Sequence, residues 1–334
     1  MSISVITTNV YPERIQIATI IRNLGEQTFK DFEWVFVDAY YLENKEIVKE
    51  LSQKAGLKRV VHAPFVGGSH IGRQFHWECY NDALLLSSEK HFLRLGVYRY
   101  FHHSVVQTAV DHAHNDTWIS LRQQDIRDFD PALSHQEIVD RYKLETNTVQ
   151  QWNQMVSHCG MFSFSRDKMV EICGNNEALI IHHWEDVDLN CRWAHLGQVK
   201  LLSLDNAFLR VYHSKSHPYR AKSYCLHPDN PNCIVWAKNN HELENYPQPN
   251  MEWIEYRGFR WARCPVCGAV AVGYCDKYFE WLKKEPQALI APIGVGGVGR
   301  DIRILDEDMS KLSTLESKWE LLASSHSDPR YLGN

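Results

Sequence analysis

The sequence predicts an α/β fold built on a mixed, mostly parallel sheet that is flanked by helices. Three short apolar runs have the length and the β-branched or aromatic content of buried strands: residues 2–7, 32–37 and 58–62. The stretches between these runs repeat apolar residues at helical spacing: residues 12–27 and 43–55. Strands that alternate with helices in this way pair in parallel through right-handed crossovers. Because ligands of such sheets bind beyond the carboxyl ends of the strands, we expect a site near residues 7–11 and 38–42.

The later elements follow in order along the chain. Pro12 opens the first helix, and Gly197 is a typical helix stop after the helix at 185–196. Further helices are predicted at residues 77–88, 100–113, 166–173 and 308–324. Further strands are predicted at residues 92–97, 161–165, 199–204 and 208–212. The polar region 115–155 is predicted to be a strand and an excursion that covers the site.

Bulk composition bounds the class of protein. The chain has 334 residues, and its 44% apolar content supports a sizeable core rather than disorder. The formal charge of −5 gives no support to nonspecific binding of nucleic acid, which requires a basic surface. Neither a signal peptide nor an apolar run long enough for a membrane span is visible, so the sequence predicts a soluble, cytoplasmic protein. In that compartment the nine cysteines are expected to be thiols or metal ligands.

A change in composition predicts two domains. Pro, Asn, Cys and His cluster between residues 217 and 250, and residues 291–300 are rich in glycine. We therefore place a boundary near residue 220, with one domain at 1–220 and a small, cysteine-containing C-terminal extension at 221–334.

Three segments carry most of the functional signal. The first reads Ile3-Ser-Val-Ile-Thr-Thr-Asn-Val-Tyr-Pro-Glu-Arg, followed by Gln27-Thr-Phe-Lys-Asp-Phe-Glu-Trp-Val-Phe-Val-Asp. The second reads Cys159-Gly-Met-Phe-Ser-Phe-Ser-Arg. The third reads Trp184-Glu-Asp-Val-Asp-Leu-Asn-Cys-Arg, followed by Leu196-Gly. In this order and spacing, over about residues 2–217, they resemble the inverting family 2 glycosyltransferases of the GT-A fold.

The resemblance implies a nucleotide pocket at the first segment. The predicted donor-binding residues are Thr7, Asn9, Asp38, Arg73 and Tyr98. Asp38 ends a strand, where its carboxylate can accept hydrogen bonds from a uracil or a ribose, although a solvated turn aspartate fits the same position. Thr7 and Asn9 fit the pocket wall, and as the turn after a strand they fit capping roles equally.

The third segment holds the predicted catalytic residues, Asp186 and Glu185. Carboxylates at a helix start also match the positive end of the helix dipole, which is a purely structural reading. An inverting transferase needs a general base that takes the proton of the attacking hydroxyl, and the resemblance assigns this role to Asp186. Trp184 and His183 are the predicted acceptor-binding residues, with core packing as the alternative for Trp184.

The sequence departs from the family at the position of its Asp-x-Asp motif, where this chain has Gly96-Val-Tyr. Without those carboxylates, dependence on Mn²⁺ or Mg²⁺ is left open. The residues that can replace them are of three kinds: arginines (Arg73, Arg94, Arg99), His213 with Lys215 after the last strand, and displaced carboxylates (Asp111, Asp116, Asp125). His213 is the predicted ligand of a divalent ion, with a purely structural histidine as the alternative.

The cysteines suggest a second metal. Cys264 and Cys267 form a Cys-x-x-Cys turn typical of a zinc knuckle, and Cys275 is a third candidate ligand. Structural Zn²⁺ and free thiols both stay open. The surrounding basic and aromatic residues fit a nucleic-acid base, and they fit a folded cap or a homodimer contact as well.

The sequence thus predicts a glycosyltransferase that moves a sugar from a nucleotide-sugar, with UDP as the expected nucleotide, to a soluble acceptor with inversion. Two alternatives stay open. One is a non-catalytic relative that binds a nucleotide-sugar or a glycan. The other is a transferase that acts on a modified nucleic-acid base. The acceptor class, whether glycan, protein or nucleobase, is not specified by the sequence.

Overall fold

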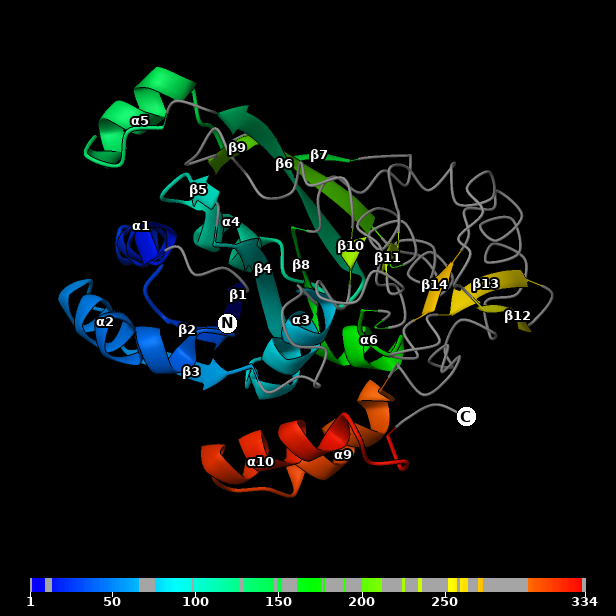
Figure 1. The fold of residues 1–334 in the computed structure, drawn as a ribbon. Helices are drawn as coiled ribbons and strands as arrows, with labels where there is room; N and C mark the ends of the chain where they lie inside the picture. Colours follow the sequence, from blue (N-terminus) through cyan, green and yellow to red (C-terminus); the bar gives the residue numbers. More distant parts are fainter. Residues whose placement is uncertain are drawn as a thin grey trace. The chain divides into compact units, whose positions relative to one another are not determined.

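The structure is a computed structural model in which two units are described separately. Unit 1 comprises residues 1–65, 82–169 and 198–217, and unit 2 comprises residues 66–81, 170–197 and 218–334. Figure 1 shows the elements of both units along the chain. The described residues are 2–9, 14–65, 76–97, 99–126, 129–146, 149–151, 161–175, 177, 189, 200–211, 224–225, 234–235, 252–256, 259–263, 270–272 and 300–331.

One half of the main sheet of unit 1 is entirely parallel. It consists of β1 (Ile3–Asn9), β2 (Phe32–Asp38), β3 (Arg59–Pro64) and β4 (His91–Gly96), in the order β3-β2-β1-β4. Every residue of β1 and β2 is buried, which explains why these strands read as continuous apolar runs rather than as an alternating pattern.

The other half of the sheet is mixed. Next to β4 lies β8 (Phe162–Ser165), which is antiparallel to it and is followed by β6 (Thr117–Ile126) and β9 (Lys200–Val211). Two short strands, β5 (Arg99–Phe101) and β7 (Val149–Gln151), pair antiparallel with β9. Of the nine strands in this sheet of the described chain, β5, β7 and β8 run one way and the other six run the opposite way. The predicted α/β class with a mixed, mostly parallel sheet is therefore confirmed.

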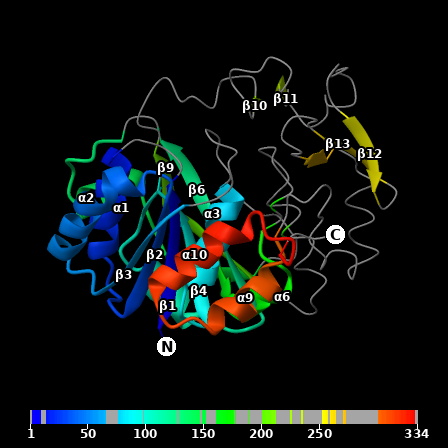
Figure 2. The ribbon, with the colours of Figure 1, turned by 60° about the horizontal axis from the view of Figure 1, so that its bottom comes forward.

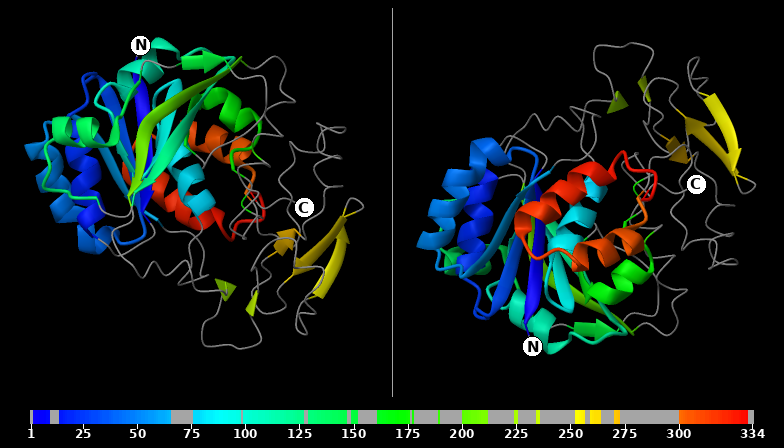
Figure 3. Two further views of the ribbon diagram at one scale, coloured as in Figure 1. Left: turned by 90° about the horizontal axis from the view of Figure 1, so that it is seen from above. Right: turned by 90° about the horizontal axis from the view of Figure 1, so that it is seen from below.

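The main core of unit 1 lies between one face of the sheet and three helices. These are α1 (Arg14–Gly25), α2 (Tyr41–Lys54) and α4 (Val105–Asp111), and α1 and α2 lie together on one side of the sheet in Figure 3. Their buried residues, such as Ile20, Val48 and Val105, pack with strand residues that include Val5 and Trp34. At the end of α1, a Cβ on Gly25 would lie 2.8 Å from the Cβ of Ala55, so the close approach of the chain after α2 requires this glycine.

A second, smaller core lies in the excursion between β6 and β7. This excursion carries α5 (His135–Tyr142), which begins with a capping box formed by Ser134 and Glu137. The core combines Phe129, Ile138 and Leu144 of the excursion with Tyr100, Ile126 and Leu209 of the sheet. The predicted strand and excursion at 115–155 are therefore confirmed. That they cover the site stays a prediction.

Four predicted elements need correction. The predicted helix at 100–113 begins with strand β5, and only residues 105–111 are helical, because the first residues pair with β9. The predicted strands at 199–204 and 208–212 form one strand, β9, along which the register with β6 shifts at Leu121 to Gln123. The predicted helix at 308–324 is two helices, α9 (Ile302–Ser310) and α10 (Leu315–Ser325), because Thr314 caps the start of the second.

Unit 2 contains α9 and α10 as neighbouring helices, drawn in orange and red in Figure 2. Arg300 precedes α9 and forms a bidentate ion pair with Glu177, in which each side chain is 1% exposed. Asn81 donates to the same carboxylate, and Ser325 of α10 accepts from Arg300. The described parts of the cysteine-containing extension also form two small sheets: β10 (Tyr224–Cys225) with β11 (Ile234–Val235), and β12 (Glu252–Tyr256), β13 (Phe259–Arg263) and β14 (Val270–Val272).

Candidate functional site

The candidate site lies at the carboxyl ends of the central parallel strands of unit 1. Strand β1 has β2 on one side and β4 on the other, so the chain connections leave β1 and β4 in opposite directions. Such a switch point in an open α/β sheet leaves a crevice where ligands bind. In the register of the sheet, Asn9 lies opposite Asp38 of β2, and Thr8 lies opposite Gly96 of β4.

Asp38 has a fully buried carboxylate that is surrounded by donors. Its Oδ1 accepts hydrogen bonds from Asn9 Nδ2 at 2.9 Å and from the backbone N–H of Tyr40 at 2.8 Å. Its Oδ2 accepts from Asn44 Nδ2 at 3.0 Å and lies 3.3 Å from His62 Nε2. An ionised carboxylate has about four lone-pair sites, and all four are occupied here by groups of the protein itself.

This arrangement makes Asp38 the point at which four segments meet. It joins the end of β1 through Asn9, the turn before α2 through Tyr40, the first turn of α2 through Asn44, and β3 through His62. Chemically, the carboxylate fixes the loops at the end of the strands rather than presenting a free acceptor.

Asn44 and His62 are site residues that the sequence reasoning missed. Asn44 lies six residues after Asp38 in the first part of α2, a position where an amide usually indicates only a surface residue. His62 stacks on Phe36 with the ring centroids 5.0 Å apart, and Tyr41 tilts against its ring. The one sequence signal for the arrangement was the strand-ending Asp38 itself, because an aspartate at such a turn readily binds the backbone two residues later.

Thr7 has a different environment. Its hydroxyl accepts a hydrogen bond from Trp34 Nε1 at 2.9 Å within the core face of the sheet, and its side chain is fully buried. The structure therefore brings Asn9 and Asp38 together and places Thr7 beside Trp34. A donor-binding role for the three residues stays a prediction.

The end of β4 carries no carboxylate in its described residues, Gly96 and Val97. Arg94 is 2% exposed, with its guanidinium 5.3 Å from the ring centroid of Phe162. Arg99 donates from Nε to the sulfur of Met161 at 3.2 Å. Asp111 is exposed and accepts from Gln107 at 2.7 Å.

The described residues at this edge do not form a group of metal ligands. The lone pairs of Asp38 are occupied, and in the described parts of the chain no three His, Cys, Asp or Glu side chains are grouped as metal ligands. The remaining predicted site residues lie outside the described residues: Arg73, Tyr98, His183, Trp184, Glu185, Asp186, His213, Cys264, Cys267 and Cys275. Their roles, including those in binding a divalent ion or zinc, stay predictions.

None of the helices within the described ranges combines the length and the apolar character that crossing a membrane requires.

Comparisons with known proteins give similarity at the level of structure only. No protein-family model matches the sequence, and no curated protein matches it. S. aureus TarS 1–349 in complex with UDP is similar to this chain with a TM-score of 0.47 and 15% identity, over 64% of this chain and 61% of that chain. TarS 1–349 in complex with UDP-GlcNAc gives a TM-score of 0.47 and 16% identity, over 65% of this chain and 60% of that chain. The chain thus spans less than two thirds of the length of TarS 1–349, and similarity at these values places it in no family.

Proposed function

We propose that this chain is a glycosyltransferase that takes a sugar from a nucleotide-sugar, with UDP as the expected nucleotide, and transfers it with inversion. The observation that carries the proposal is the paired Asn9 and Asp38 at the switch point of a mixed, mostly parallel sheet. The three sequence segments that resemble family 2 glycosyltransferases begin with the strands that bear these two residues.

In the proposed reaction, Asp186 is the general base. Its carboxylate takes the proton of an acceptor hydroxyl while the hydroxyl oxygen attacks the anomeric carbon of the donor sugar. The bond between that carbon and the phosphate oxygen breaks, and the nucleoside diphosphate leaves with the bonding electron pair. Because attack and departure occur on opposite faces, the configuration at the anomeric carbon inverts.

Residues 96–98 have no carboxylate that could hold a divalent ion. Another group therefore has to balance the charge of the leaving diphosphate. We propose that guanidinium groups such as Arg73 serve here, because their planar fork matches two phosphate oxygens. Under this proposal the transferase keeps its activity in EDTA.

The decisive experiment measures donor binding and turnover separately. Calorimetric titration with UDP and a panel of UDP-sugars, with Mn²⁺ and with EDTA, is expected to show binding of UDP and at least one UDP-sugar. Asp186→Asn is expected to lower turnover about 100-fold or more with donor affinity unchanged, since general base catalysis contributes on this scale. Asp167→Asn, in an exposed position of α6 (Arg166–Glu171), is the matched control and should keep full activity. Full activity of Asp186→Asn would show that the base is another residue, and no binding of any nucleotide-sugar would refute the function.

A second candidate is a non-catalytic protein that binds a nucleotide-sugar or a glycan. It is favoured by the absence of a carboxylate at Gly96 and Val97. This candidate predicts binding of a donor but no release of UDP from it, either in EDTA or with Mn²⁺.

A further inference from the structure

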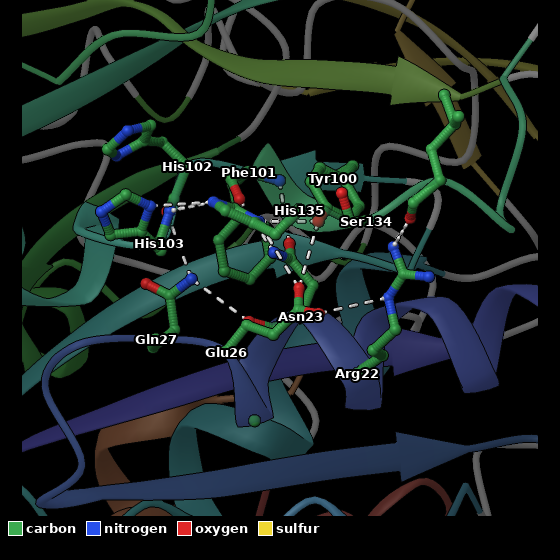
Figure 4. Close-up of polar contacts among 12 residues, drawn as sticks. Arg22, Asn23, Glu26, Gln27, Tyr100, Phe101, His102, His103, Ser134 and His135 are labelled. Atoms are coloured by element: carbon green, nitrogen blue, oxygen red, sulfur yellow. Dashed lines mark hydrogen bonds and ion pairs between the residues drawn. The ribbon is translucent and has the colours of Figure 1, made fainter. Parts of the chain in front are cut away.

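Three histidines gather in unit 1, and none of them is assigned a part in the proposed reaction. They are His102 and His103, which follow β5, and His135, the first residue of α5. Together with Tyr100 and Glu26 they form the group that we call the His135 cluster, shown in Figure 4. The ring centroids of His103 and His135 lie 4.9 Å apart, and those of His102 and His103 lie 4.0 Å apart.

The hydrogen bonds around His135 indicate which of its nitrogens carries the proton. The backbone N–H of His103 donates to His135 Nε2 at 3.2 Å, so Nε2 holds a lone pair. His135 Nδ1 lies 2.7 Å from the hydroxyl of Tyr100, which in turn donates to Glu26 Oε2 at 3.1 Å. A neutral His135 with its proton on Nδ1 satisfies all of these contacts at once.

His103 completes the arrangement. Its Nδ1 lies 2.9 Å from His135 Nε2, and since that atom is an acceptor, His103 carries its own proton on Nδ1. The two rings thus share one hydrogen bond across the gap between the turn after β5 and the start of α5. In this direction the bond requires an unprotonated His135 Nε2, and with a proton on both nitrogens it cannot form.

The cluster fastens the excursion that carries α5. Besides the contacts of His135, Arg22 of α1 donates to the carbonyl oxygens of Pro131 at 2.6 Å and Leu133 at 3.1 Å. The same excursion contributes Phe129 and Ile138 to the smaller core described above. The polar contacts at residues 131–135 therefore close one side of that core.

The electrostatics of the cluster favour the neutral forms of His102 and His103. Burial, and then the neighbouring rings of His103 and His135, lowers the pKa of His102 to about 4. Burial, followed by the charge His135 acquires on protonation, lowers the pKa of His103 as well. Burial, and next the carboxylate of Glu26, raises the pKa of Tyr100 far above its ordinary value, so its hydroxyl keeps the proton that it donates.

Glu26 supplies the only carboxylate that faces His135 among the described residues, and Arg22 already offsets part of its charge at 3.6 Å. Burial acts to raise the pKa of Glu26, but the hydrogen bond with His135, the charge of Arg22 and the hydroxyl of Tyr100 together hold it below its ordinary value. The titratable or charged groups facing His135 are thus Arg22 from α1, Glu26 just after it, Tyr100 from β5, and His102 and His103 from the turn that follows β5. The first histidine of the cluster to be protonated can pair with Glu26, and a second one finds no further carboxylate among these groups.

We propose that the His135 cluster is a pH-sensitive latch that holds residues 129–146 against the sheet at neutral pH and releases them on acidification. When both His103 and His135 are protonated, two N–H groups point at each other across 2.9 Å and the rings have to separate. The backbone N–H of His103 loses its acceptor at the same step. The proposal does not depend on the proposed transferase activity.

The direction of the pH effect follows from the pKa values. An unperturbed histidine has a pKa of about 6.5, so the released cluster binds protons below that pH more readily than the closed one. Because the pKa values of His102 and His103 in the closed state are lowered, the stability of the latch is present above about pH 6.5 and is lost as the pH falls towards the closed-state values.

Hydrogen exchange of the full chain at pH 7.5 and pH 5.5, corrected for the intrinsic pH dependence of exchange, tests the latch. Amide protection of residues 129–146 is expected to fall about tenfold between these pH values, because each unit below the unperturbed pKa is worth a factor of ten. Protection in β1 and β2 is expected to stay constant. Unchanged protection of residues 129–146 in the wild type would overturn the proposal.

Variants separate the latch from general acid sensitivity. In His135→Gln an amide oxygen replaces Nε2 as the acceptor, so protection of residues 129–146 is expected to be lower at pH 7.5 and to depend less on pH than in the wild type. His103→Asn keeps a donor near the position of Nδ1 and removes one titrating group, so the loss of protection in this variant should begin at lower pH. His103→Asn also provides the test if His135→Gln does not fold. His114→Gln, an exposed histidine outside the cluster, should respond as the wild type does. A wild-type pH response in both His135→Gln and His103→Asn would overturn the proposal as well.

Discussion

At the scale of single residues, the most informative one is Asp38. A buried carboxylate is costly unless its charge is met by hydrogen bonds, and here four donors from four segments meet it. The same residue therefore stabilises the fold and shapes the edge at which we expect a nucleotide to bind. Asn9 depends on it directly through the 2.9 Å hydrogen bond.

Asp38→Asn is expected to lower the free energy of unfolding by about 1–3 kcal/mol, because the new amide group presents donors to groups that are themselves donors. Denaturant unfolding measures this change, and titration of the same variant with UDP is expected to show weaker binding as the loops lose their anchor. Asp31→Asn is the control, since the side chain of Asp31 is 78% exposed, and it should change stability by no more than about 0.5 kcal/mol. Equal stability of the two variants would contradict the anchoring role.

At the scale of elements, the packing of α1 against the end of α2 depends on the lack of a side chain at Gly25. A Cβ at this position would lie 2.8 Å from the Cβ of Ala55 and 2.9 Å from its carbonyl oxygen. Helix propensity alone favours alanine over glycine by about 1 kcal/mol. The steric cost of overpacking, about 1–3 kcal/mol, opposes this gain and decides the sign.

Gly25→Ala is therefore expected to destabilise unit 1, with a lower midpoint in thermal unfolding. Lys45→Ala, at an exposed position of α2, provides the matched control, because it also places alanine in a helix but meets no backbone. A Gly25→Ala protein at least as stable as the wild type would mean that the chain after α2 can move aside.

The sequence predicted elements whose own residues determine them. The β-branched runs of β1 and β2 and the apolar repeat of α1 need no partner to be recognised, and their order implies the parallel half of the sheet. Strands β5 and β7 have three residues each and become strands only by pairing with β9, so no local pattern marks them. The helix break before α10 depends on the cap that Thr314 provides, and the apolar spacing does not reveal this cap.

The candidate site divides in the same way. Asn9 and Asp38 are predicted together because Asn9 follows the first predicted strand and Asp38 ends the second, and parallel strands end at the same edge of a sheet. Asn44 and His62 reach Asp38 from α2 and β3, and their contribution depends on how those elements pack. The His135 cluster joins Glu26, which follows α1, with residues of β5, of the turn after β5 and of α5, and nothing in the sequence brings Glu26 and His135 together.

At the scale of the whole molecule, residues 300–331 are an integral part of unit 2. Arg300 and Glu177 form their ion pair at 2.7 Å with both side chains 1% exposed, and Asn81 and Ser325 complete the network. Cys173 is buried next to the start of α9, where Ile302 N–H donates to its sulfur. Residues from four distant parts of the sequence thus form one buried network of an ion pair and hydrogen bonds.

Arg300→Met is expected to lower the free energy of unfolding by about 3–5 kcal/mol, because it leaves the Glu177 carboxylate buried without its partner. Lys54→Met, which removes the exposed ion pair with Glu50 on α2, is the matched control and should leave the unfolding midpoint unchanged. The double variant Arg300→Met with Glu177→Leu should recover part of the loss. A small effect of Arg300→Met would show that residues 300–331 are only loosely attached.

Strand β9 has a consequence for how the chain is assembled during synthesis. Strands β1 to β4 come from residues 3–96, so they can pair while the ribosome is still translating the rest of the chain. Strands β5 and β7 wait for β9, whose residues 200–211 emerge about a hundred positions after β5, whereas β6 also pairs with β8. Until then β5 and β7 lack their pairing partner, so we expect the second half of the sheet to complete its folding after the parallel half.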